Sequence, residues 1–117
     1  MKAYTDIEQS KKLAEILSIE SADGWWTSLN WQETEYYIEV KQDGINKPKK
    51  CIPCWSLATL LDVLPSPQLS KDKLGSGKVG WMVSVYPNAC RYDFCWHDNP
   101  IDAVFEIIIR LHSNQLL

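Results

Sequence analysis

The fold is decided by residues 80–111, which read GWMVSVYPNACRYDFCWHDNPIDAVFEIIIRL. Residues 80–86 read as a strand, and residues 91–96 alternate between apolar and polar side chains as a returning strand, so this stretch predicts a β-hairpin. Asn99 then has the side chain of a helix N-cap, and Pro100 suits the first helical position because its missing N–H is not needed there. Apolar residues follow at helical spacing. A hairpin followed by an amphipathic helix indicates an α+β fold.

Further elements are indicated on the N-terminal side of this stretch. Thr5 and Glu8 form the capping-box pattern that starts a helix, and we expect this helix to end near residues 18–21. Residues 53–64 predict a second and deeply buried helix, since apolar side chains cover most of its circumference. The remaining segments are two expected strands, 25–31 and 35–41, and a polar loop, 68–80. The chain is therefore expected to be a single domain over residues 1–117, with a small, mostly antiparallel sheet of about three or four strands packed with about three helices.

Composition places the chain among ordinary globular proteins. It has 117 residues, 45% of them hydrophobic and 23% charged, with a net charge of −3. Nucleic-acid-binding domains usually carry a positive excess, so the charge argues against a nucleic-acid partner, and Lys47, Lys49 and Lys50 indicate a solvated loop. The N-terminus lacks the apolar segment of a signal peptide, and the longest apolar run, residues 107–109, is too short to span a membrane. We therefore expect a cytoplasmic protein with reduced cysteines and no membrane contact.

The chain has four cysteines and two histidines, and one cysteine pair suggests chemistry. Cys51 and Cys54 are spaced Cys-Ile-Pro-Cys ahead of a predicted helix. This arrangement could form a thiol–disulfide redox pair, because a helix dipole favours the thiolate form of the first cysteine. The residues that lead into Cys51 are lysines and a proline rather than a buried strand, which does not match the usual setting of such a pair.

The same pair, combined with Cys90 and Cys95, could instead hold structural zinc, with His97 as a further ligand. Strand alternation sets Cys90 and Cys95 on opposite faces, so buried reduced cysteines are favoured over this metal site. A catalytic group of Cys95, His97 and Asp98 is not expected either, because neighbours on a strand point to different faces.

Six tryptophans in so short a chain are the second unusual feature. Trp55 and Trp81 lie in the most apolar segments, and we expect them in the core. Trp25, Trp26 and Trp31 lie near a turn, in a segment that predicts an irregular strand. Partly exposed indole rings favour protein contacts because they bury a large area at little cost in entropy. These three residues form the candidate interaction surface.

Three blocks of the chain resemble a known family. The blocks are residues 5–17 with 21–23, residues 53–57 with the later Leu60-Leu61 and Leu64-Pro65, and residues 98–103. They are similar to a family of small uncharacterised proteins from Bacteroides-type gut bacteria and their mobile elements. The resemblance implies no activity, and no site residue is carried over from it.

The leading functional hypothesis is a non-enzymatic binding or accessory protein that acts through contact with an unknown protein partner. The excess of tryptophan favours this hypothesis. We expect no cofactor, and a monomer or weak homo-oligomer. The alternatives are a redox protein that uses Cys51 and Cys54 and a structural zinc-binding module.

Overall fold

A computed structural model describes residues 2–28, 35–40, 51–73, 76–88 and 91–117. Its elements are, in chain order, α1 (Ile7–Ala14), a short 3-10 helix η1 (Ile19–Ser21), β1 (Gly24–Ser28), β2 (Tyr36–Val40), β3 (Ile52–Cys54), α2 (Leu57–Val63), β4 (Gln68–Lys73), β5 (Val79–Asn88), β6 (Arg91–His97) and α3 (Pro100–Ser113). Within the described ranges, no helix is both long enough and apolar enough to cross a membrane.

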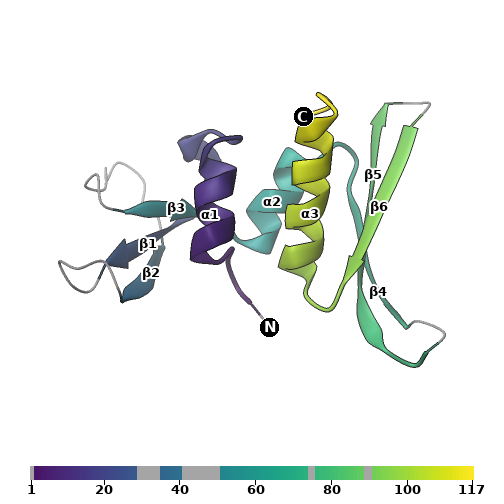
Figure 1. The fold of residues 1–117 in the computed structure, drawn as a ribbon, viewed down its shortest axis with the longest axis horizontal. Helices are drawn as coiled ribbons and strands as arrows, with labels where there is room; N and C mark the ends of the chain where they lie inside the picture. The colour runs from purple at the N-terminus through teal and green to yellow at the C-terminus, as the bar shows by residue number, and fades with distance from the viewer. Residues whose placement is uncertain (1, 29–34, 41–50, 74–75, 89–90) are drawn as a thin grey trace.

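The strands of the described residues form two antiparallel three-stranded sheets. One sheet has the order β2-β1-β3, and the other has the order β4-β5-β6. Figure 1 shows one sheet at each end of the molecule with α1, α2 and α3 between them, and α3 lies along β5 and β6. The predicted α+β class, with three α-helices and antiparallel strands, is confirmed. The strands divide between two sheets where the sequence indicated one.

Helix α3 carries the centre of the hydrophobic core. It begins as predicted, because the Asn99 side chain accepts a hydrogen bond from Ile101 N (2.9 Å) and Pro100 occupies the first turn. The large aliphatic side chains that this helix buries completely are Ile101, Val104, Ile107, Ile108 and Leu111. They form one cluster with buried side chains of β5 and α2, among them Val83 and Leu60. The hairpin and the last helix thus stabilise each other by burying a shared apolar surface.

Helix α1 begins one residue later and ends several residues earlier than the sequence indicates. Asp6, rather than Thr5, is the N-cap: Asp6 Oδ1 accepts a hydrogen bond from Gln9 N (2.8 Å), and Gln9 Oε1 accepts one from Asp6 N (3.1 Å). The Thr5 hydroxyl is fully buried and accepts a hydrogen bond from Trp55 N (3.2 Å). The Thr5 side chain therefore links the start of α1 to the segment before α2 by a hydrogen bond, instead of capping the helix. The helix ends at Ala14, and only η1 follows in the region where its end was predicted.

The predicted helix over residues 53–64 is wrong in its first part. Helix α2 starts at Leu57 after its N-cap Ser56, and the preceding Ile52–Cys54 form β3, where Pro53 lies opposite Trp25 of β1. Pro53 is tolerated because β3 is an edge strand, which does not need every N–H for pairing. A short apolar run fits a strand or a helix equally well, and here pairing with β1 determines the outcome.

The predicted loop over residues 68–80 is wrong over Gln68–Lys73, which form β4. Strand β4 lies at the edge of its sheet and pairs with β5 from Gln68 opposite Ser84 to Lys73 opposite Val79. An edge strand can be polar because its outer side faces water. Its polar composition therefore concealed the strand in the sequence.

A small charged network ties the N-terminal segment to α3. Lys2 Nζ lies 2.7 Å from Asp102 Oδ1 and 3.1 Å from Asp6 Oδ2. Gln9 Nε2 also donates to Asp102 Oδ1 (2.8 Å). Partial burial raises the pKa of Asp102, but the hydrogen bonds from Lys2 and Gln9 and the Lys2 charge outweigh it, so the pKa is lowered overall. The charged form of Asp102 therefore stabilises the folded state.

We expect Asp102→Asn to lower the free energy of unfolding at neutral pH by less than about 1 kcal/mol, because this ion pair is partly exposed to water. A lowered folded-state pKa means that the contribution is present above the ordinary aspartate pKa and is lost as the pH falls through the lowered value. Urea unfolding over a pH series should show the difference between wild type and variant shrinking in strongly acidic solution. Asp62→Asn, an exposed site on α2, is the matched control and should show no such trend. A difference that grew on acidification would contradict this assignment.

Candidate functional site

Three side chains that commonly bind metals converge between β6 and α3. Cys95 and His97 are two residues apart on β6, so they point to the same face of the sheet, and α3 covers that face. Glu106 projects from α3 toward them. Cys95 Sγ, His97 Nε2 and a carboxylate oxygen of Glu106 all lie within 4.8 Å of one another. We call these three residues the Cys-His-Glu cluster.

The path of the chain explains the convergence. After β6 the chain turns at residues 98–99, and α3 runs back along the strand. Glu106 therefore lies opposite His97, with His97 Nε2 2.8 Å from Glu106 Oε2. One helical turn later, Arg110 Nη1 lies 2.8 Å from Asp93 Oδ1. Arg110 Nη2 also lies 4.0 Å from Glu106 Oε2, one turn back on the same helix. Two sets of side-chain contacts thus fix the register between the helix and the strand.

The electrostatics of the cluster keep the thiol protonated and the carboxylate charged. Burial raises the pKa of Cys95 to about 12, and its hydrogen bond to Glu106 and the nearby negative charge act in the same direction. The hydrogen bonds that Glu106 receives from Cys95 and His97 hold the pKa of this carboxyl below its ordinary value. Without a metal, Cys95 is therefore a hydrogen-bond donor to Glu106 rather than a thiolate nucleophile.

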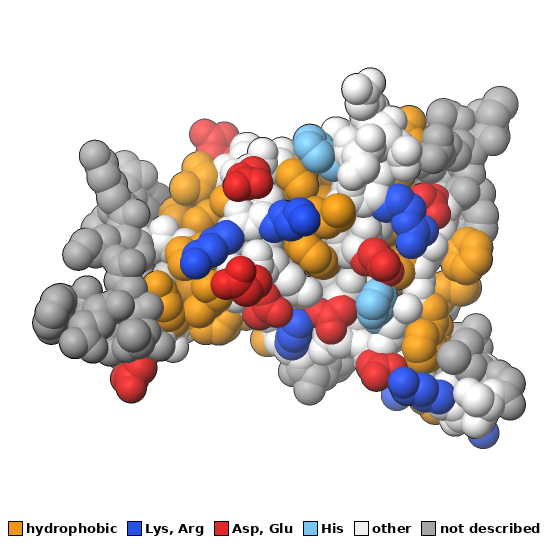
Figure 2. Space-filling model, in the orientation of Figure 1, with side chains coloured by type: hydrophobic (Ala, Val, Ile, Leu, Met, Phe, Trp, Pro, Cys, Tyr) orange, Lys and Arg blue, Asp and Glu red, His pale blue; other side chains and the backbone are white. Residues whose placement is uncertain are grey.

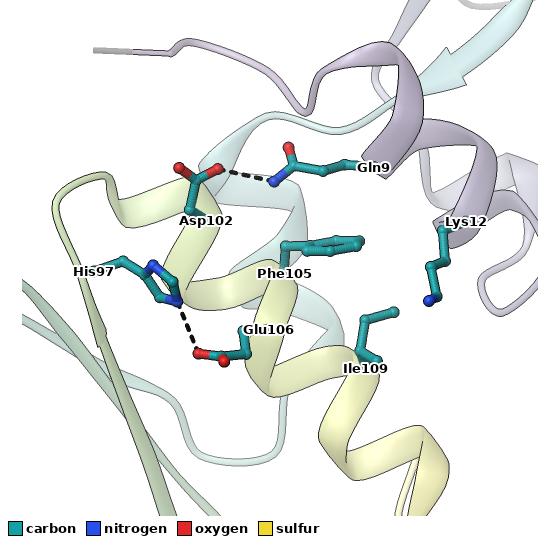
Figure 3. A pocket seen from close by; sticks show the side chains of 7 residues that line it. All are labelled: Gln9, Lys12, His97, Asp102, Phe105, Glu106 and Ile109. Atoms are coloured by element: carbon teal, nitrogen blue, oxygen red, sulfur yellow. Dashed lines mark hydrogen bonds and ion pairs between the residues drawn. The ribbon is translucent and has the colours of Figure 1, made fainter.

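A pocket of about 460 Å³ opens beside the cluster, between α1 and α3. His97 and Glu106 line it at one end, and Phe105 and Ile109 of α3 form its apolar part (Figure 3). Its other lining residues are Gln9, Lys12 and Asp102. Figure 2 shows hydrophobic side chains in the middle of this face, surrounded by charged side chains and histidine. An apolar hollow with a few polar groups is typical of a small-molecule site.

Cys51 and Cys54 lie elsewhere, at β3 in the other sheet. An extended segment places residues three apart at about 10 Å between Cα atoms, whereas a disulfide needs less than about 7 Å. Cys54 is completely buried, and burial together with the Asp23 charge raises its pKa to about 12. This geometry gives no support to a redox pair. Cys90, the remaining member of the four-cysteine zinc hypothesis, lies outside the described residues.

We expect Cys54 to resist alkylation in the native protein. It is buried and protonated, whereas Cys51 is partly exposed. Iodoacetamide at mildly alkaline pH, followed by mass spectrometry of the peptides, should modify Cys51 and leave Cys54 intact until denaturant is added. Equal labelling of both in the folded protein would contradict the burial of Cys54.

The predicted tryptophan surface is only partly described. Trp25 is buried, with 7% of its surface exposed. Trp26 is partly exposed, and its Nε1 donates to Thr5 O (2.9 Å). It lines a smaller hollow of about 260 Å³ together with Tyr4 and Ile38. Trp31 lies outside the described residues. Of the three predicted residues, Trp26 is therefore the one that the described structure places at an accessible hollow.

The Cys-His-Glu cluster was not predicted from the sequence, although the spacing of two of its three residues indicates that they lie close together. The zinc hypothesis and the group of Cys95, His97 and Asp98 both contain Cys95 and His97, but neither uses the two-residue spacing between them. The spacing of two between Cys95 and His97 already places both on one face of a strand. Glu106 could not be added without knowing that α3 folds back along β6.

No protein-family model, curated protein or solved structure matches the chain.

Proposed function

We propose that the protein binds a transition-metal ion of the zinc class through Cys95, His97 and Glu106. The observation that carries this proposal is the approach of their three donor atoms to within 4.8 Å. Zinc binds sulfur, imidazole nitrogen and carboxylate oxygen at about 2.0–2.3 Å, so donors on one ion lie roughly 3.5 Å apart. Small side-chain rotations would bring the three donors to that separation.

The chemistry of the donor set favours this class of ion. A thiolate selects zinc, iron or copper over magnesium and calcium, which prefer oxygen ligands alone. When the ion binds, the Cys95 thiol loses its proton to the solvent and the thiolate coordinates the ion. The thiolate and the Glu106 carboxylate then balance the two positive charges of the ion. Arg110, which is itself held by Asp93, lies 4.0 Å from Glu106 Oε2, the carboxylate oxygen that also contacts Cys95 and His97.

The proposed centre differs from the four-cysteine site considered from the sequence. It uses Cys95 and His97 of β6 with a glutamate, while Cys51 and Cys54 lie in the other sheet. Three protein ligands leave one position of a tetrahedral ion open, as in zinc sites that bind a further ligand.

A metal titration of the full chain tests the proposal. Chelator-stripped protein is titrated with Zn²⁺ by calorimetry and with Co²⁺ by absorption spectroscopy. We expect one equivalent of metal to bind, and Co²⁺ to produce a near-ultraviolet thiolate-to-cobalt charge-transfer band. Cys51→Ser should bind equally well. No saturable binding, or a band that survives Cys95→Ser and disappears in Cys51→Ser, would overturn the proposal.

Contact with a protein partner is a second candidate function, favoured by the apolar hollow that Trp26 lines with Tyr4 and Ile38. Ile38 is partly exposed on β2, so Ile38→Asp would place a charge at this hollow. Under this hypothesis, affinity capture with the wild-type chain recovers a partner that the Ile38→Asp variant does not. Equal recovery by both would contradict it.

A further inference from the structure

The pocket beside the Cys-His-Glu cluster has the features needed to hold a ligand of the metal. His97 and Glu106 belong both to the cluster and to the pocket lining, whereas Cys95 is 5% exposed and lies on the core side. Protein atoms thus occupy the space behind the metal position. A further ligand of an ion held by the cluster would therefore approach from the pocket side.

The charged side chains around the pocket differ in whether they already have a partner of opposite charge. Asp102 is paired with Lys2 and Gln9, and Glu106 is held by the cluster. Lys12 of α1 also lines the pocket, and among the described residues no carboxylate forms an ion pair with it. The Cys95 thiolate and the Glu106 carboxylate would neutralise a divalent ion. With the metal bound, the charge of Lys12 would therefore favour a negatively charged ligand.

Apolar surface lies between the metal position and this lysine. Phe105 and Ile109 are four residues apart on α3, so they lie on the same face of the helix, and both line the pocket (Figure 3). Figure 3 shows Lys12 beside Ile109, with His97 and Glu106 on the other side of Phe105. A ligand that fills the pocket would contact the metal at one end, the apolar surface of Phe105 and Ile109 along its length, and Lys12 at the other end.

We infer that the pocket binds a small amphiphilic carboxylate, whose donor atom at one end coordinates the metal while its apolar body covers Phe105 and Ile109 and its carboxylate pairs with Lys12. This inference rests on the proposed metal site and names the class of ligand that the site would take.

The test uses Co²⁺-loaded full-length protein and ω-mercaptocarboxylates of increasing chain length as probes. The probe thiol loses its proton to the solvent and binds cobalt as a thiolate, which increases the charge-transfer band while cobalt stays bound. The matching ω-mercaptoalcohols, which lack the carboxylate, are the control ligands. We expect the best carboxylate to bind about threefold to fivefold more tightly than its alcohol, the effect of one partly exposed charge pair.

Two variants assign this preference to a residue. Lys12→Gln should remove the preference for the carboxylate and leave alcohol binding unchanged. Lys11→Gln, the neighbouring exposed lysine outside the pocket lining, should leave both unchanged.

The outcomes distinguish failure of the metal site from failure of the ligand site. If cobalt binds but its spectrum does not respond to any probe, the open position does not face the pocket and the inference is wrong, while the metal site stands. Equal binding of carboxylate and alcohol, or a preference that survives Lys12→Gln, also overturns it. If cobalt does not bind, the proposed function fails and the inference fails with it.

Discussion

Glu106→Gln is expected to weaken Zn²⁺ binding by at least about 100-fold, since even residues that only orient metal ligands cost about 10–100-fold when replaced. The amide keeps the size of the side chain and its ability to accept hydrogen bonds from Cys95 and His97. It loses the negative charge that balances the metal. Calorimetric titration measures the change, and urea unfolding of the metal-free variant checks that the fold is intact.

The neighbouring Asp98→Asn is the matched control. Asp98 is an exposed acid next to His97 in the sequence, and it pairs with Lys78 (3.3 Å) rather than with the cluster. This variant should bind Zn²⁺ as wild type does. Cys95→Ser and His97→Ala should resemble Glu106→Gln, because each removes one of three ligands. A Glu106→Gln affinity within about threefold of wild type would exclude this carboxylate as a ligand.

Trp55→Ala is expected to lower the free energy of unfolding by about 3–5 kcal/mol, the usual cost of removing a large buried aromatic side chain. Trp55 is completely buried. Its Nε1 donates to Ser21 Oγ (2.9 Å), and its backbone carbonyl accepts a hydrogen bond from Thr5 N (2.9 Å). Trp55 belongs to the same core cluster as Leu13 of α1 and Leu60 of α2. Since a domain is stable by only about 5–15 kcal/mol, the variant should lose more than about 10 °C in Tm.

Val79→Ala provides the comparison, because Val79 lies on β5 but is half exposed. Its effect should stay within about 0.5 kcal/mol. Thermal unfolding followed by circular dichroism measures both variants. A loss below about 1 kcal/mol for Trp55→Ala would contradict the placement of Trp55 in the core.

The sequence predicted best those elements whose signals are local. In residues 80–111 the strand pattern, the Asn99 cap and the apolar stripe of α3 all indicate the same structure, and each is present in it. The prediction was weaker where a segment has a partner far away in the chain. Ile52–Cys54 become a strand because β1 pairs with them, and Gln68–Lys73 do so because β5 does. Such pairing leaves little trace in the composition of a short segment.

The candidate site likewise combines a feature that local sequence predicts with one that only the tertiary fold provides. Strand periodicity alone places Cys95 and His97 on one face of β6. Glu106 joins them through the packing of α3 on β6, which depends on the whole core and not on spacing in the sequence. The Cys51–Cys54 spacing was more conspicuous, but pairing of β3 with β1 extends that segment and separates the two thiols. The apparent cysteine motif and the convergent cluster are therefore in different sheets.

The most direct test of the metal centre is anomalous diffraction at the zinc absorption edge from crystals of the Zn²⁺-loaded protein. We expect one strong anomalous peak between β6 and α3. That peak should lie about 2.3 Å from Cys95 Sγ and about 2.0–2.2 Å from His97 Nε2 and a Glu106 carboxylate oxygen. No peak at this position, or a peak at Cys51 and Cys54 instead, would contradict it.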